Sequence, residues 1–165
     1  MTRWEERAAE ERALLNPSFC AVLLWSASAG FRSVSSSAFP LELSFLVLPL
    51  VLHRETRESL PKAVTTSLPV WLEEHALTRA RFPARARALV PFTREALLFG
   101  CAHGMLLLSP SGLSDSGDFK KKIAEELKRA SDEVRLCANR AHFIGRWFAS
   151  AGTPATVMAL LGVRP

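Results

Sequence analysis

The residues best suited to chemistry are three cysteines and four histidines. Two pairs have spacings that suit a metal ion, Cys101-x-His103 and Cys137-x4-His142, and Zn²⁺ would accept all four ligands if the pairs met. The thiol of Cys101 is also a possible nucleophile, which would need a histidine as its base. Both cysteines fall on apolar helix faces, where small buried cysteines are ordinary. We therefore expect neither a metal site nor a catalytic residue.

Other motifs with a known chemistry are not found in the sequence. It contains no GxxxxGK[ST] or GxGxxG loop for a nucleotide, and no HExxH or CxxC pattern for a metal. A mixed-charge cluster, His53-Arg54-Glu55 followed by Arg57-Glu58, has the side chains for acid–base work, but surface ion pairs of little energetic weight are the simpler interpretation. The sequence predicts a non-enzymatic protein with no cofactor and no small-molecule substrate.

A basic stretch is the remaining candidate site. The segment from His75 to Arg94 contains no acidic residue, and its arginines are Arg79, Arg81, Arg85, Arg87 and Arg94. The simpler interpretation is a solvated helix face. The more specific interpretation is a contact surface for phosphate groups or for an acidic partner. These five arginines are the candidate contact residues.

Composition limits the class of protein that carries these residues. The chain has 165 residues, a length that suits one domain or two very small ones packed together. Of these residues 48% are apolar and 22% are charged, as expected for a folded chain with a buried core. Its formal charge of +5 permits anionic partners without requiring them. Three widely spaced cysteines favour a reducing compartment. No segment reaches the length of a membrane span, and the residues before Ala27-Ser28-Ala29 are not positive enough for a signal peptide, so we predict a cytoplasmic protein.

The first half of the chain is predicted to be helical. An amphipathic helix is expected at about 3–15, and Asn16-Pro17 begins a second helix that ends near Gly30. This second helix is apolar nearly all round, so it should lie at the centre of the core. The run from Leu41 to Leu52 could be a buried strand, but its length and the charged residues that follow it favour a helix with a kink at Pro49. Another helix is expected from Thr65 to Glu74.

The middle of the chain has the element order of a winged helix. Pro91 separates the arginine-rich helix from a second helix, Thr93 to Cys101, and a glycine stop follows. Next come the short apolar strand Met105 to Leu108 and the turn Ser109 to Gly112. Helices followed by a hairpin predict a winged helix-turn-helix-like unit over about 65–117, with its small β-hairpin near 105–115.

The last third of the chain is dominated by one apolar stripe. Its residues are spaced alternately three and four apart, from Phe119 to Phe148. This pattern predicts one long helix at about 118–150, roughly 45 Å in length, which packs along the body or presents a seam to a partner. Thr153-Pro154 begins a last short helix. The expected fold is therefore mainly α, a single helical domain over residues 1–165.

Several segments resemble a known family. They are Asn16 to Cys20, Leu46 to Pro61, Thr66 to His75, Phe82 to Leu106 and Phe143 to Pro165. Together they resemble the middle component of three-component ABC-ATPase systems. The resemblance implies a small, non-enzymatic bacterial protein that works with an SMC/Rad50-like ABC ATPase and a variable third component. Such systems are thought to act in biological conflict, chiefly in defence against phage or plasmids.

Three hypotheses follow for the function. The leading one is an adaptor that couples the ATPase to an effector; its arginines would contact acidic protein, or DNA held by the ATPase. The alternative is a winged-helix DNA-binding regulator, which needs a basic recognition helix and wing. Here the wing from Ser109 to Gly117 carries Asp115 and no arginine or lysine. The third and least supported hypothesis is an enzyme that uses Cys101 and a histidine.

Overall fold

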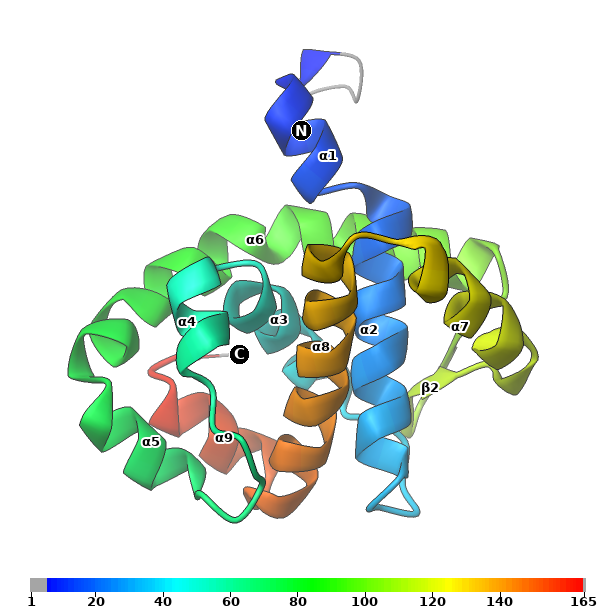
Figure 1. The fold of residues 1–165 in the computed structure, drawn as a ribbon. Coiled ribbons are helices and arrows are strands. Elements are labelled where there is room, and N and C mark those ends of the chain that lie inside the picture. Colours follow the sequence, from blue (N-terminus) through cyan, green and yellow to red (C-terminus); the bar gives the residue numbers. More distant parts are fainter. Residues whose placement is uncertain (1–5, 165) are drawn as a thin grey trace.

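The computed structural model describes residues 6–164, and its fold is mainly α, as the sequence predicts. Figure 1 shows the arrangement of the elements. In chain order they are α1 (Ala9–Leu14), α2 (Pro17–Arg32), α3 (Leu41–Val51), α4 (Arg54–Ser59), α5 (Leu68–Glu74), α6 (Ala76–Ala102), β1 (Leu106–Ser109), β2 (Gly112–Asp115), the 3₁₀ turn η2 (Gly117–Phe119), α7 (Lys120–Arg129), α8 (Asp132–Ser150) and α9 (Pro154–Leu160).

Helices α2 and α8 lie side by side at the centre of the molecule (Figure 1). A Cβ atom at Gly30 would lie 2.0 Å from the carbonyl oxygen of His142, and one at Gly145 would lie 1.9 Å from that of Ala27. The two helices therefore run antiparallel, with their backbones in contact where they cross. Because α2 is buried on almost every side, the prediction that it lies at the centre of the core is confirmed.

Buried arginine side chains hold the end of α3. The last carbonyls of a helix have no intrahelical donor, so they need one from elsewhere. The side chain of Arg57, on α4, is 2% exposed and donates to the carbonyl of Val51 at 2.6 Å. The same guanidinium pairs with Glu133 in the first turn of α8. Arg57 thus joins three helices, and the prediction that it forms only a surface ion pair is wrong.

Helix α6 is continuous over 27 residues and contains both Pro83 and Pro91. It runs in an arc over the body (Figure 1). The predicted separate helix from Thr93 to Cys101 is therefore wrong, because this segment is the last third of α6. Thr93 is not an N-cap; it is buried, and its hydroxyl donates to the carbonyl of Leu89 at 3.1 Å. Packing of the buried face against the core holds the helix together across Pro91, despite the hydrogen bond that proline removes.

The hairpin forms where the sequence predicts it, with β1 and β2 paired antiparallel from Leu106–Asp115 to Ser109–Gly112. Phe39 extends it through an isolated bridge to Leu113. The hairpin is tied to α2, since Asp115 accepts hydrogen bonds from Arg32 at 2.9 Å and from Ser28 at 3.2 Å. The winged-helix detail is not confirmed, because only α5 and the continuous α6 precede the hairpin within residues 65–117.

The predicted helix at about 118–150 is divided into α7 and α8. Ala130 and Ser131 both have extended backbone, with ψ of 164° and 160°. Ser131 caps α8 by accepting a hydrogen bond from the amide of Val134, and Asp132 and Glu133 lie in the first turn. Acidic residues at a helix start and a serine at the N-cap are both stabilising. The expectation of one unbroken helix is corrected accordingly, while α8 remains a long helix of 19 residues.

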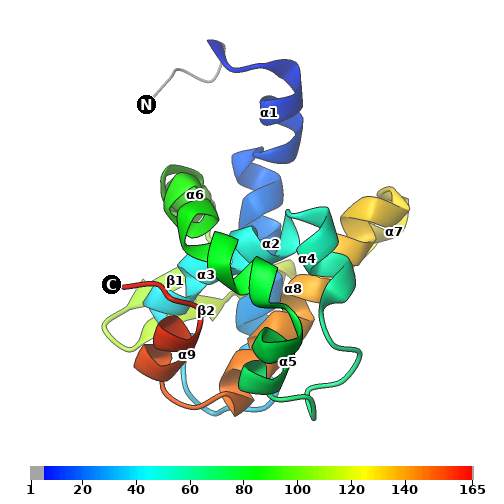
Figure 2. The same cartoon turned by 90° about the vertical axis from the view of Figure 1, so that its left-hand side faces the viewer.

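The N-terminal segment stands apart from the rest of the body. Helix α1 begins at Ala9, and Trp4, which the sequence places in the same helix, lies outside the described residues. Figures 1 and 2 both show α1 projecting away from the other helices. Arg7 fastens this segment to α6, with its Nη1 donating to Glu95 at 2.8 Å and its guanidinium 5.2 Å from the ring centre of Phe92.

One segment, Glu11–Arg32, is long and apolar enough to cross a membrane, contrary to the sequence expectation. Of its most apolar window, 56% is buried inside the fold. Core helices and signal sequences near an N-terminus satisfy the same length and hydropathy criterion. The burial of α2 against α8 accounts for the apolar character of this segment in the structure.

Candidate partner-binding surface

The five candidate arginines lie on one helix, α6, but they do not form one surface. Arg85 is half-buried and points into the body. Its Nη1 donates to the hydroxyl of Thr56 at 2.9 Å and to the carbonyl of Pro49 at 3.3 Å. Burial lowers the pKa of its guanidinium below the usual value. Arg85 therefore supports the end of α3, and we remove it from the candidate contact residues.

Arg81 lies on the same side of α6 as Arg85, near helix α4. The two arginines are four residues apart on the helix, and Arg85 donates to Thr56 of α4, so this side of α6 faces α4. Burial first, and then Arg85, lowers the pKa of His53. Arg81 is itself exposed. It belongs to the α4 side of the helix.

Arg79, Arg87 and Arg94 lie on the other side of α6. Arg87 and Arg94 line a groove of ≈ 690 Å³, and Arg79 lines a smaller hollow that shares Pro83 and Gly162 with it. Seven residues are nearly two helical turns, so Arg87 and Arg94 follow each other along one face, roughly 10.5 Å apart along the axis. All three side chains are exposed. Among the side chains that the structure describes, none of the three forms an ion pair with an acidic residue.

The groove itself is formed by three parts of the chain, α3, α6 and the segment from Met158 of α9 to Arg164, and we call it the α3–α6 groove. In Figure 2, α6, α3 and α9 appear in this order from top to bottom. Apolar side chains form its floor, including Phe45 from α3, Val90 from α6 and Val163 from the C-terminal segment. Glu42 and Arg164 are its remaining charged lining residues. An apolar floor edged by exposed, unpaired arginines is suited to binding another molecule.

The cysteines and histidines are not assembled into a site. Within residues 6–164 no group of three or more histidine, cysteine or acidic side chains is placed to hold a metal ion. His103 stacks on Phe99 with ring centres 4.1 Å apart, and its Nδ1 donates to the carbonyl of Phe99 at 2.9 Å. Burial raises the pKa of the thiols of Cys101 and Cys137. A raised pKa disfavours the thiolate that nucleophilic attack requires.

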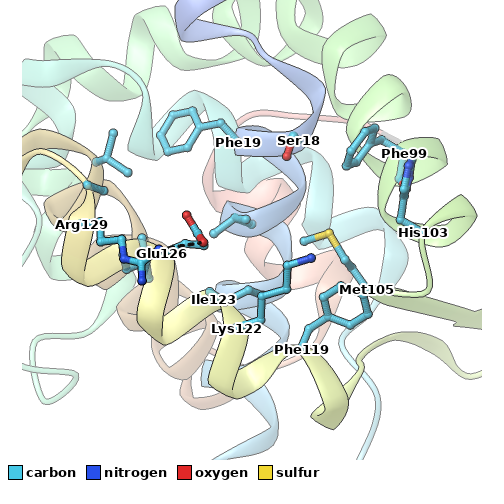
Figure 3. Close-up of a pocket in the computed structure, with 14 residues that line it drawn as sticks. Ser18, Phe19, Phe99, His103, Met105, Phe119, Lys122, Ile123, Glu126 and Arg129 are labelled. Atoms are coloured by element: carbon cyan, nitrogen blue, oxygen red, sulfur yellow. Dashed lines mark hydrogen bonds and ion pairs between the residues drawn. The ribbon is translucent and has the colours of Figure 1, made fainter.

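A second hollow, of ≈ 470 Å³, lies between α2, the end of α6 and α7. Figure 3 shows Phe19 and Phe99 on one side of it and Ile123 and Lys122 on the other. Its walls are mostly apolar, and Glu126 and Arg129 at one end lie 4.0 Å apart as an ion pair. The arrangement offers no nucleophile with an adjacent base. We therefore regard the α3–α6 groove as the stronger candidate.

Sequence reasoning identified Arg87 and Arg94 but missed the groove that they border. Phe45 and Arg164 line the same groove although they lie more than a hundred residues apart in the sequence. No local pattern links the two segments, because the groove depends on how α3, α6 and α9 pack. The run of arginines without an acidic residue was the only feature of the sequence that pointed to this groove.

Comparison with protein families matches residues 4–165 to the family described as ABC-three component (ABC-3C) system Middle Component 3. Comparison with curated proteins and with solved structures gives no match. The family match covers nearly the whole chain and includes every element that lines the groove.

Proposed function

The chain belongs to the family of ABC-three component system middle components, and on this premise we propose that it is a non-catalytic adaptor. In this proposal it couples an SMC/Rad50-like ABC ATPase to a third, effector component of a bacterial three-component system. The system would act in the cytoplasm, against phage or plasmids. The family match over residues 4–165 is the observation on which the proposal rests.

The structure adds two kinds of support. The described cysteines and histidines are separated or engaged with neighbouring groups, so the proposal assigns no reaction to this chain. A middle component also needs surfaces for other components. The α3–α6 groove, with exposed Arg87 and Arg94 at its edge, is a surface of this kind.

The alternative, a winged-helix regulator that reads DNA by itself, has less support. Thr93 to Cys101 does not form a separate recognition helix. The acidic residue of the wing, Asp115, turns inward and pairs with Arg32 of α2. The hairpin therefore supports the fold, whereas a DNA-reading wing would present basic side chains to the phosphate backbone.

Co-expression with the neighbouring ATPase and third component tests the proposal. We expect a stable complex that elutes as one species in size-exclusion chromatography at micromolar concentration. Separate elution of this chain from both components under these conditions would contradict the adaptor function. Salt-sensitive binding of duplex DNA by the isolated chain would instead support the regulator.

A further inference from the structure

The α3–α6 groove combines apolar and basic character, and this combination limits what it can bind. Arg87, Arg94 and Arg164 are exposed at the groove, whereas Glu42 is its one acidic lining residue. We propose that the groove binds an amphipathic helix of a partner protein that carries acidic residues along one edge of its apolar stripe. This inference rests on the proposed adaptor function, and it specifies the chemistry of the partner.

The spacing of the arginines suits a helical ligand. Arg87 and Arg94 repeat after seven residues, nearly two turns of α6, so they present two cations in a row about 10.5 Å apart. A helix lying along α6 repeats its own side chains at the same interval. Glutamates at positions i and i+7 of the partner would then meet both arginines at once.

The floor of the groove requires apolar contact. Phe45, Val90 and Val163 line the groove and are each only partly buried, and Val90 lies between Arg87 and Arg94 in the sequence. An apolar stripe on the ligand would remove these side chains from water, which is favourable in proportion to the area buried. The ligand's leucine stripe should therefore lie over these three side chains.

Duplex DNA fits the same groove poorly. A phosphate backbone gains nothing from the apolar side chains of the floor, and Glu42 on the α3 side would repel it. Arg81, which a basic DNA-binding face would use, lies on the α4 side of the helix. Glu42 also favours one orientation of a protein ligand. The ligand's acidic edge would face α6, and its neutral or basic edge would face α3.

Fluorescence anisotropy with a labelled 18-residue peptide tests this inference on the full chain, independently of the ATPase complex. The probe is an alanine- and leucine-based helix with glutamates at two positions seven residues apart beside the leucine stripe. A second peptide carries lysines in place of the glutamates. Arg87→Glu and Arg94→Glu are the test variants. Arg81→Glu is the matched control, an exposed arginine on the other side of the same helix.

We expect the acidic peptide to bind the unaltered protein more tightly than the basic peptide does. Reversing both Arg87 and Arg94 should weaken its binding about tenfold, since two attractions become repulsions. The doubly reversed protein should then prefer the basic peptide, a change that misfolding cannot produce. Arg81→Glu should leave the preference unchanged.

Equal binding of the two peptides by the unaltered protein would overturn the inference, as would an equal loss in Arg81→Glu. Binding of a 20-base-pair duplex that depends on Arg87 and Arg94, without binding of the acidic peptide, would assign the groove to DNA. The adaptor function would survive either result if the ATPase complex still formed. Loss of that complex with intact peptide binding would contradict the adaptor function alone.

Discussion

Gly30 of α2 and Gly145 of α8 lie where the two central helices cross, and neither position has space for a Cβ atom. The nearest atoms are backbone atoms of the opposite helix, 2.0 Å from a Cβ at Gly30 and 1.9 Å from one at Gly145. Backbone atoms cannot move aside as the end of a flexible side chain can. The separation of α2 and α8, and so the position of everything packed on them, depends on these two glycines.

Gly145→Ala should destabilise the protein. Alanine is the better helix former by about 1 kcal/mol, but pushing α2 and α8 apart costs about 1–3 kcal/mol or more. The clash should therefore dominate in urea unfolding, with a lower midpoint. Gly117→Ala is the control, because a Cβ there meets nothing within 4 Å. Equal stability of the two variants would show that the crossing is looser than described.

Arg85→Ala and Arg87→Ala should behave differently although they lie on one helix. Removing Arg85 takes a donor from both the carbonyl of Pro49 and the hydroxyl of Thr56. We expect a loss of about 1–2 kcal/mol in the free energy of unfolding. Exposed Arg87 has no such partners, and its removal should change stability by less than about 0.5 kcal/mol. Similar melting temperatures for both variants would mean that Arg85 contributes no more to stability than an exposed surface residue does.

His53 should make part of the stability depend on pH. Its Nδ1 accepts the amide hydrogen of Thr56 at 3.3 Å and caps α4, so it must be unprotonated there. Burial and the charge of Arg85 lower its pKa below the ordinary value of 6.5. The folded state thus binds the proton less readily than the unfolded state. The contribution is complete above pH 6.5 and is lost as the pH falls below that value.

His53→Asn provides the measurement, since asparagine is also a good N-cap and does not titrate. Unfolding by urea at pH 7.5 and at pH 5.5 should show a smaller loss of stability in the variant than in the unaltered protein. His142, whose pKa burial also lowers, is present in both proteins and cancels in the comparison. An identical loss in both proteins would exclude His53 as a source of the pH dependence.

Asp115→Ala should loosen the hairpin without unfolding the protein. The side chain of Asp115 accepts hydrogen bonds from Ser28 and Arg32 of α2. Its loss leaves the strand with the bridge from Phe39 to Leu113 and with the hydrogen bonds from Ser28 and Arg32 to backbone carbonyls of the strand. The amide hydrogens of Phe39 and Leu113 should then exchange with solvent faster. Exposed Asp118 is the matched control. Unchanged exchange in Asp115→Ala would mean that the contacts to the hairpin backbone are sufficient to fasten it.

Local patterns predicted α2 and the hairpin because these segments have one dominant signal each. The prediction of α3 depended on the length of its apolar run, since a shorter run would have suited a buried strand. The prediction of a helix boundary at Pro91 was wrong. It was made because a proline followed by Thr93 resembles a helix start. The buried face of α6 continues across that point through Phe82, Ala86, Thr93 and Ala96. Tertiary packing of this face outweighed the local helix breaker.

The opposite error occurred at Ser131. The apolar stripe runs through it without a break, and the stripe alone predicts one helix. Ser131 followed by Asp132 and Glu133 is nevertheless a strong helix-start signal, and α8 begins at this point. The groove was beyond any such pattern, because Phe45, Val90 and Arg164 meet only through the packing of distant segments.

The prolines within α6 give this helix uneven stiffness. Neither Pro83 nor Pro91 has an amide hydrogen, so the carbonyls of Arg79 and Arg87 lack their usual donors four residues on. The helix therefore lacks one backbone hydrogen bond beside Arg87, which borders the groove, and another beside Arg79, which borders the smaller hollow. A partner bound in the groove would therefore lie against the part of α6 that Pro91 leaves with one backbone hydrogen bond fewer.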